Sequence, residues 1–152
     1  MSAHRIARVE RTDLDELIPL MRGYCDFYEV APSDEELRGL ATTLLDDPEH
    51  AGVQLIARDD DGTATAFATI FWSFSTLSAT RIGVMNDLYV DGGARRHGTG
   101  AALIEACAAE CAARNVPFLE WETAPENLRA QSVYDRTDAS RTTWVSYSLR
   151  TR

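Results

Sequence analysis

The sequence contains no lysine, so all 15 of its Lys and Arg residues are arginine. A Walker-type phosphate loop depends on a lysine that reaches the nucleotide phosphates, and this class of nucleotide site is therefore excluded. Acidic residues outnumber the arginines: the 24 Asp and Glu residues give the chain a formal net charge of −9. Such acidity argues against general binding to nucleic acid. It suits a cationic ligand by attraction, or it serves only solubility.

Long apolar runs are missing as well. No run approaches the roughly 20 residues of a membrane-spanning helix, and the first 15 residues lack the apolar segment of a secretory signal. We therefore expect a cytoplasmic protein with no membrane partner. Cysteine is scarce: Cys107 and Cys111 lie four residues apart, with no histidine or third cysteine near them in the sequence. This pattern favours packed thiols in a reducing compartment over a metal site.

The length of 152 residues suits a single domain over 1–152. In some segments apolar residues recur with the period of a strand, and in others with the period of a helix. The succession of these segments predicts the order β-α-α-β-β-β-α-β-α-β. This order indicates an α/β or α+β domain with a mixed sheet. A capping box, Ser33-x-x-Glu36, predicts the start of the second helix. The predicted strands are 5–10, 53–58, 64–74, 84–90, 118–122 and 143–149, and the last two helices are 101–114 and 126–136.

The most informative stretch runs from a strand at 84–90 through a glycine-bearing turn into a helix. Gly98 and Gly100 permit positive φ and let the backbone point its N–H groups toward one place. These amides, the dipole of the following helix, and Arg95 and Arg96 together predict an anion site. Phosphate and pyrophosphate are the anions that fit it best.

A dinucleotide-binding loop is an alternative, because Gly98-x-Gly100 opens a helix and Glu120 lies about twenty residues further on. The third glycine position of that motif is occupied by Leu103, which would crowd the packing of helix on strand. Too little chain follows for the usual series of βαβ units. The dinucleotide alternative is therefore disfavoured.

Two motifs resemble the GNAT superfamily of N-acetyltransferases. Residues 95–100 have the pattern Arg-x-x-Gly-x-Gly of its acyl-CoA loop, and residues 127–134 have the Asn-x-x-Ala-x-x-x-Tyr pattern of its downstream helix. The strand 86–90 and the segment 24–29 are similar to the diamine/polyamine and histone-type branch. The resemblance covers nearly the whole chain. It implies a GNAT-like mixed, mostly antiparallel sheet with splayed central strands flanked by helices.

The resemblance implies acetyl-CoA as the cofactor. Backbone groups of the strand would bind the pantetheine arm, and the loop amides would hold the pyrophosphate. The resemblance assigns cofactor binding to Leu88, Tyr89, Val90, Arg95, Arg96, Gly98, Thr99, Gly100, Ala101, Asn127 and Tyr134.

Candidate catalytic groups follow from the same resemblance. Tyr134 would act as general acid toward the leaving CoA sulfur, because a phenol of pKa about 10 can protonate a thiolate whose conjugate acid has a pKa of about 8.5. The alternative is a packed helix tyrosine. Several diamine enzymes carry Glu where this chain has Asn86, which cannot accept a proton but could orient a water. Asp87 and Glu122 are the substitute bases, and Asp87 could equally be structural.

The acceptor pocket is predicted at the end of the first helix. Its carboxylates would hold a second cationic group of the substrate, or they form only a solvated acidic face. The substrate-binding candidates are Tyr24, Asp26, Phe27, Tyr28 and Glu29.

The expected activity is acetyl transfer to a primary amine (a polyamine, a diamine or a lysine-like amine of a small molecule or peptide) by direct attack in a ternary complex. One alternative is a non-catalytic acyl-CoA-binding or regulatory module, which Asn86 favours. Another is an enzyme that modifies an antibiotic or toxin. The resemblance also implies a homodimer in which residues 144–149 pair or pack across the interface.

Overall fold

A computed structural model describes residues 4–95 and 97–152 of the chain. The chain falls into two compact units, one through Glu122 and one from Thr123 to Arg152. In the first unit the elements are β1 (Arg5–Arg8), η1 (Arg11–Asp13), α1 (Leu14–Phe27), α2 (Asp34–Asp46), β2 (Gly52–Arg58), β3 (Ala64–Ser75), β4 (Thr80–Val90), η2 (Gly92–Ala94), α3 (Thr99–Ala113) and β5 (Leu119–Glu120). The second unit contains α4 (Leu128–Tyr134).

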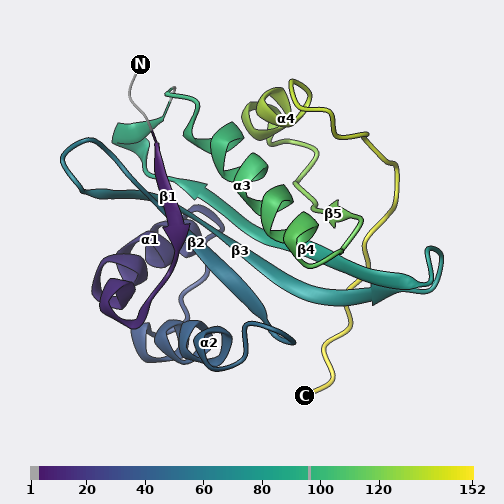
Figure 1. The fold of residues 1–152 in the computed structure, drawn as a ribbon, viewed down its shortest axis with the longest axis horizontal. Coiled ribbons are helices and arrows are strands. Elements are labelled where there is room, and N and C mark those ends of the chain that lie inside the picture. The colour runs from purple at the N-terminus through teal and green to yellow at the C-terminus, as the bar shows by residue number, and fades with distance from the viewer. Residues whose placement is uncertain (1–3, 96) are drawn as a thin grey trace. The chain divides into compact units, whose positions relative to one another are not determined.

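The strands of the first unit form one sheet in the order β1-β2-β3-β4-β5 (Figure 1). The first three pairings are antiparallel, and β4 pairs with β5 in parallel. Residues Gly83 and Val84 are the part of β4 that pairs with β5, so the two strands separate beyond this point. The prediction of a mixed, mostly antiparallel sheet with splayed central strands is confirmed.

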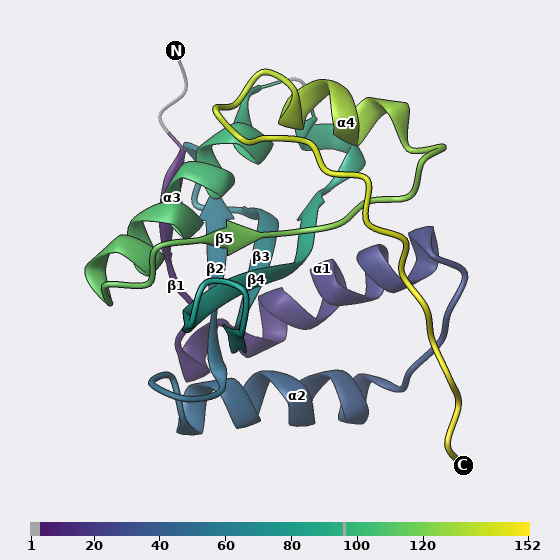
Figure 2. The ribbon, with the colours of Figure 1, turned by 90° about the vertical axis from the view of Figure 1, so that its right-hand side faces the viewer.

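Helices cover both faces of this sheet, with α1 and α2 on one face and α3 on the other (Figure 2). Under α1 and α2 the core includes Leu17, Ile56 and Phe67, all buried. On the opposite side Leu103 and Cys107 of α3 are fully buried. Burial of apolar surface on both faces therefore holds β3 and β4 in the middle of the unit.

Local sequence signals account for the start of α2. The Ser33 hydroxyl accepts a hydrogen bond from the Glu36 backbone N–H at 3.1 Å, and the Glu36 carboxylate accepts one from the Ser33 N–H at 2.7 Å. These two bonds satisfy N–H groups that have no partner inside the helix. The predicted capping box is confirmed.

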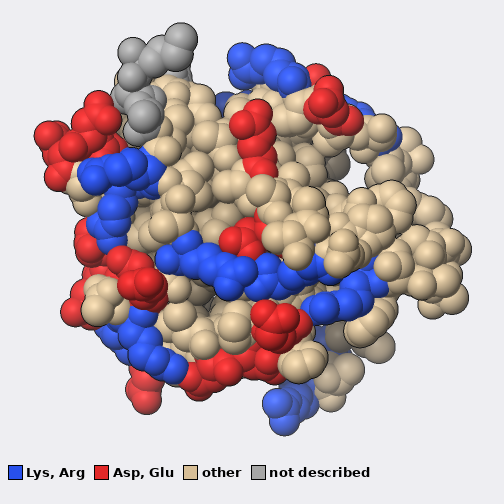
Figure 3. Space-filling view, in the orientation of Figure 1, with Lys and Arg blue, Asp and Glu red and all other residues tan. Residues whose placement is uncertain are grey.

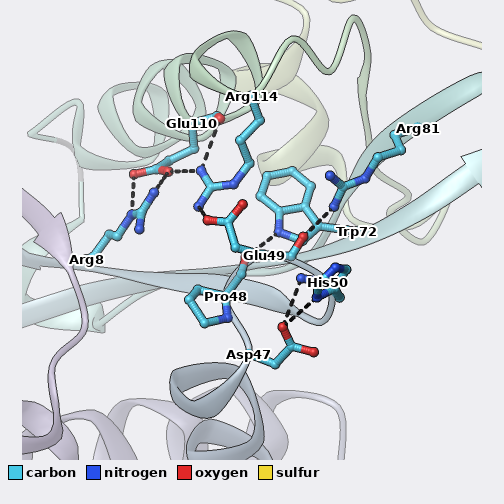
Figure 4. Close-up of polar contacts among 9 residues, drawn as sticks. All are labelled: Arg8, Asp47, Pro48, Glu49, His50, Trp72, Arg81, Glu110 and Arg114. Carbon is cyan, nitrogen blue, oxygen red and sulfur yellow. Dashed lines mark hydrogen bonds and ion pairs between the residues drawn. The ribbon is translucent and has the colours of Figure 1, made fainter.

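Arginine side chains provide polar packing between α3, β1, β3 and the α2–β2 connection. A band of arginine side chains crosses the face of the molecule in Figure 3, with acidic side chains beside it. Glu110 of α3 binds Arg8 of β1 at 2.8 Å and Arg114 at 2.7 Å (Figure 4). The Arg114 guanidinium lies 4.9 Å from the centre of the Trp72 ring, whose Nε1 donates to the Pro48 carbonyl at 2.8 Å. These contacts join the end of α3 to β1, β3 and the α2–β2 connection.

The predicted strand at 143–149 is wrong: in the described part of the chain after α4, residues 135–152, the backbone forms no strand. Alternation of apolar and polar residues favours an extended strand, but a strand also needs a partner for its backbone groups. The side chains of Trp144, Tyr147 and Leu149 are 81%, 93% and 86% exposed instead. A single domain over 1–152 stays a prediction.

Other boundaries differ from the predictions. β1 ends at Arg8, two residues before the predicted end of the first strand, and α3 begins at Thr99. β4 begins at Thr80, four residues before the predicted strand, because its first residues pair with the end of β3 through Ser75. β5 is only Leu119–Glu120, shorter than the predicted 118–122. The helix predicted over 126–136 is Leu128–Tyr134.

Candidate active site

A β-bulge interrupts β4 near its middle. Thr69 of β3 lies opposite Asp87, and the next residue, Ile70, lies opposite Met85, so Asn86 is the extra residue. A bulge of this kind re-aims side chains and releases backbone groups from the ladder. Asn86 is exposed and Asp87 is only 6% exposed, so adjacent residues at the bulge face very different surroundings.

Asp87 is the centre of a polar cluster beside this bulge. The Asn86 Nδ2 donates to Asp87 Oδ1 at 2.9 Å, and the side chains of Thr69 and Tyr24 also hydrogen-bond the carboxylate. Burial raises the pKa of Asp87 above its ordinary value, and these hydrogen bonds to the ionised form oppose the rise. A carboxyl of raised pKa is better matched to accepting a proton near neutral pH than an exposed one.

The cluster extends into the sheet through two buried polar side chains that are not among the residues predicted from the sequence. Gln54 of β2 donates from Nε2 to the Thr69 hydroxyl oxygen at 3.1 Å, and both residues are buried. Because the Thr69 oxygen accepts from Gln54, its own proton is left to donate toward Asp87. The available signal was a single polar residue inside each of two otherwise apolar strand segments, VQLIA and FATIF.

Aromatic side chains at the end of α1 lie beside the polar cluster around Asp87. The Tyr24 hydroxyl donates to the Asn86 carbonyl at 3.3 Å, and burial, followed by the nearby charge of Asp87, raises the pKa of Tyr24. The Tyr24 ring lies 5.0 Å from that of Tyr28, which lies 5.1 Å from that of Phe27. The predicted substrate-binding tyrosines and phenylalanine are thus brought together, next to Asp87.

The end of α1 is open to solvent. Phe27 is 56% exposed and Tyr28 is 44% exposed, and the carboxylates of Asp26 and Glu29 are exposed too. Glu29 has a left-handed backbone with φ of 56°, a position where helices usually end in glycine. The predicted acidic residues therefore lie at the same helix end as the aromatic group, at its solvent side.

Gly23 brings α1 against β4 beside this cluster. A Cβ atom at Gly23 would lie 2.5 Å from the Tyr89 hydroxyl oxygen, so a larger residue would require the Tyr89 ring to move. Burial raises the pKa of Tyr89. The Tyr89 side chain is therefore part of the packing of α1 on β4.

The free edge of β4 continues from the bulge. The Gly83 N–H donates toward β5, to the Phe118 carbonyl at 2.9 Å, while further along the Asn86 and Val90 carbonyls accept from Tyr24 and Arg95. Backbone groups of a strand alternate sides with a period of two, so Leu88 directs its N–H and C=O the same way. β5 does not extend to pair with β4 there. Leu88 thus presents a backbone donor and an acceptor at the opening between the strands.

The loop after β4 leads into α3, whose N-terminus has no side-chain cap. Gly98 is the N-cap of α3, with φ of 76° and no side chain to bond the first N–H groups of the helix. The first turn carries no acidic residue. N–H groups that have no partner inside the helix, together with the positive end of the helix dipole, suit an anion. The glycine loop therefore fits the anion that the sequence predicts.

The side chains around Gly98 have different surroundings. Arg95 donates from Nε to the Val90 carbonyl at 3.0 Å, which ties the loop to β4. Thr99 is buried, and its hydroxyl contacts His4 Nδ1 at 3.1 Å. Arg96 lies outside the described residues. Gly100 and Ala101 belong to the first turn of α3.

The remaining candidates lie toward the C-terminus. Glu122 is exposed, two residues beyond the end of β5. Asn127 is the N-cap of α4 in the second unit, where its Oδ1 accepts from the Ala130 N–H at 3.2 Å. Tyr134 is the last residue of α4 and is half-buried.

The three cysteines are buried and free, as the packing prediction requires. Burial raises the pKa of Cys107 to about 12, and it also raises the pKa values of Cys25 and Cys111. Only a thiolate is an effective nucleophile, so these groups are poor candidates for covalent catalysis.

A sheet that opens beside β4 and continues into a glycine-capped helix is what an acyl-CoA-dependent transferase requires of its cofactor site. The family model described as the acetyltransferase (GNAT) family matches residues 16–138, and the chain belongs to this family. It is an N-acetyltransferase that depends on acetyl-CoA. No helix within residues 4–95 and 97–152 combines the length and apolarity that crossing a bilayer demands.

Individual relatives agree with this assignment. The chain is 28% identical over 145 residues to an uncharacterised N-acetyltransferase of Bacillus subtilis (strain 168), YhfO, covering 95% of each protein. A crystal structure of a probable acetyltransferase matches with a TM-score of 0.85 at 27% identity, over 97% of this chain and 98% of the other. An aminoglycoside N-acetyltransferase, AAC(6')-Iy, in complex with CoA shares the fold with a TM-score of 0.87 at 19% identity, covering 100% and 97%.

Proposed function

We propose that this enzyme acetylates a primary amine that carries a second cationic group, such as a diamine, a polyamine or a lysine-like amine in a basic peptide. The transfer occurs by direct attack in a ternary complex. The observation that carries the proposal is the position of Asp87: a buried carboxylate at a strand bulge, hydrogen-bonded to Tyr24 and next to an exposed aromatic and acidic helix end. These features support our proposal that the chain is a member of the diamine/polyamine and histone-type branch.

The first step of the proposal is cofactor binding by backbone groups. The first-turn N–H groups of α3 at Gly100 and Ala101, with that of Gly98, hold the pyrophosphate, and Leu88 and Val90 bind the pantetheine arm. A hydrogen bond to a charged group contributes about 1.5–3 kcal/mol, so a few such donors suffice to orient the cofactor. Acetyl-CoA, when bound, supplies the acetyl group as a thioester.

The second step is removal of a proton from the acceptor. An amine of pKa about 10.4 costs roughly 4.6 kcal/mol to deprotonate at pH 7. Asp87 takes this proton at its carboxylate, by way of a water that Asn86 orients. Asp87 is better suited than Glu122, because burial raises the pKa of Asp87 whereas Glu122 is exposed.

The third step is recognition of the distal cation. A carboxylate close to the reacting nitrogen would raise the pKa of that nitrogen and oppose attack. Asp26 and Glu29 lie at the solvent side of the aromatic group, so they hold a cation away from the reacting amine. The faces of Phe27 and Tyr28 add cation–π attraction.

Tyr134 completes the proposed reaction. Its phenol Oη donates a proton to the leaving sulfur. The group acts in its protonated form.

A panel assay tests the proposal. CoA release is measured with diamines, polyamines, basic peptides, monoamines of equal length, amino acids and aminoglycosides. We expect diamine-like substrates to give the highest kcat/KM. D26N and E29Q should raise KM for a diamine about tenfold and leave the monoamine unchanged. Equal use of monoamines and diamines would contradict the distal-cation site, and CoA binding without turnover of any amine would contradict the proposed activity.

A further inference from the structure

A histidine at the start of the chain contacts the glycine loop. His4 immediately precedes β1, and its Nε2 lies 2.6 Å from the carbonyl oxygen of His97. Its Nδ1 lies 3.1 Å from the hydroxyl oxygen of Thr99. In Figure 1 the start of β1 and the loop before α3 lie at the same end of the first unit. His97 and Thr99, the residues on either side of Gly98, are thus both hydrogen-bonded to the imidazole ring of His4.

The chemistry of these atoms determines the direction of both bonds. A carbonyl oxygen only accepts, so His4 Nε2 carries the proton and donates to His97. In the neutral ring Nδ1 then accepts, and the Thr99 hydroxyl donates to it. Thr99 is only 4% exposed, so its hydroxyl has a buried, satisfied role. The hydroxyl of Thr99 is therefore turned toward the protein.

The two hydrogen bonds of His4 form a bridge between residues 97 and 99. The residue between them, Gly98, has an unusual backbone conformation. Gly98 has φ of 76°, and a Cβ there would lie 3.9 Å from His4 Nε2, at ordinary contact distance. A glycine has a large choice of backbone conformations, and this freedom is lost when the loop binds an anion. A ring that bonds residues 97 and 99 restricts Gly98 before any ligand arrives.

We infer that His4 is a positioning residue that holds the glycine loop in its pyrophosphate-binding conformation. The inference rests on the proposed role of the loop. His4 acts from the edge of the sheet, because β1 pairs with β2 over Arg5–Arg8 and anchors the residue that precedes it. The ring touches a backbone carbonyl and a buried hydroxyl, and it leaves the first-turn N–H groups of α3 to the ligand.

Binding measurements with a matched control test this inference. H4A and T99V should each weaken binding of CoA by about three- to tenfold, since each loses one hydrogen bond of the bridge. Binding of pantetheine, which lacks the pyrophosphate, should not change. H97A is the control, because His97 contributes its backbone carbonyl and its side chain is exposed. The double variant should cost no more than the larger single loss, as expected for one shared bridge.

A second measurement needs no cofactor. Hydrogen exchange at residues 97–101 of the ligand-free protein should be faster in H4A than in wild type and unchanged in H97A. H4Q retains a donor and an acceptor and should restore part of the protection, which separates positioning from a general loss of folding. Unchanged exchange and unchanged CoA affinity in H4A would overturn the inference. If wild type binds no CoA, the proposed function of the loop fails, while exchange still decides whether His4 holds it.

Discussion

Asp87 shows how the surroundings of one residue change its chemistry. Its carboxylate is buried, which raises its pKa, and hydrogen bonds from neighbouring side chains, among them Asn86 and Thr69, oppose this rise. Glu122 has the same functional group but is exposed. Burial, more than residue type, therefore separates the two candidate bases.

We expect D87N to lower kcat/KM by about a hundredfold or more, the usual contribution of a general base. E122Q is the matched control and should retain activity. In wild type the rate should fall as pH decreases through the raised pKa of Asp87, because the base becomes protonated. A pH–rate profile for both variants checks this: an acid limb that persists in D87N would assign it to another group.

Stability should respond to pH at the same residue. Because the folded pKa of Asp87 is raised, the folded state binds a proton that the unfolded state has already released. Between the ordinary pKa and the raised one, stability from this group therefore decreases as pH rises. Urea unfolding of wild type and D87N across this window should show wild type losing stability relative to the variant. The opposite trend would mean that the fold favours the charged carboxylate.

Tyr134 is the second catalytic candidate at this scale. Y134F removes the proton donor and keeps the ring, so kcat should fall about a hundredfold with little change in the affinity for acetyl-CoA. Calorimetry and steady-state kinetics separate the two effects. Y147F, which alters an exposed tyrosine of the same unit, is the control. Normal turnover in Y134F would remove this residue from the mechanism.

At the scale of elements, the junction of β4 and α3 is where we propose that the cofactor binds. The capping of α2 by Ser33 and Glu36 shows that short motifs act locally in this chain. The N-terminus of α3 is the opposite case, because its cap is a glycine in a left-handed conformation and contributes no side chain. The first helix end is satisfied by its own sequence, whereas the second has no side-chain cap.

G98A should weaken CoA binding by about tenfold, because a left-handed conformation costs a residue with a Cβ roughly 1–2 kcal/mol. Contact with His4 adds little, since the new Cβ would meet it at 3.9 Å. G93A in the same connection is the control, because nothing lies within 4 Å of a Cβ there. Calorimetric titration of CoA into both variants gives the comparison. Similar losses in the two would show that the left-handed backbone is not what binding requires.

At the scale of the whole molecule, the C-terminal residues 144–149 form no strand and expose four large apolar or aromatic side chains. Trp144 and Tyr147 are 81% and 93% exposed, and exposed apolar groups gathered in one segment often mark an interface. The homodimer that the family resemblance implies is therefore a prediction about this segment.

We expect the double variant W144S/Y147S to shift the protein from dimer to monomer in sedimentation velocity. F74S/L77S is the control, because Phe74 and Leu77 at the β3–β4 hairpin are exposed to a similar degree, 78% and 88%. A wild-type protein that sediments as a monomer at every concentration would contradict the dimer. Dissociation by the hairpin variant instead would place the interface at β3 and β4.

Much of this protein follows from the sequence alone. The periodicity of apolar residues predicts α1, α2 and the central strands, and the pattern at 95–100 predicts the loop, because turns, caps and amphipathic faces depend on neighbours in the chain. The absence of lysine excludes a Walker-type phosphate loop. Each of these inferences needs only local chemistry.

Tertiary structure decided the rest. Burial of Asp87, the bulge at Asn86, and the contacts of Gln54 and Thr69 depend on the pairing of strands that are distant in sequence. The contact of His4 with a loop 93 residues away has no sequence signal at all. The failed strand at 143–149 has the same cause: alternation describes one chain segment, whereas a strand exists only when a second backbone lies beside it.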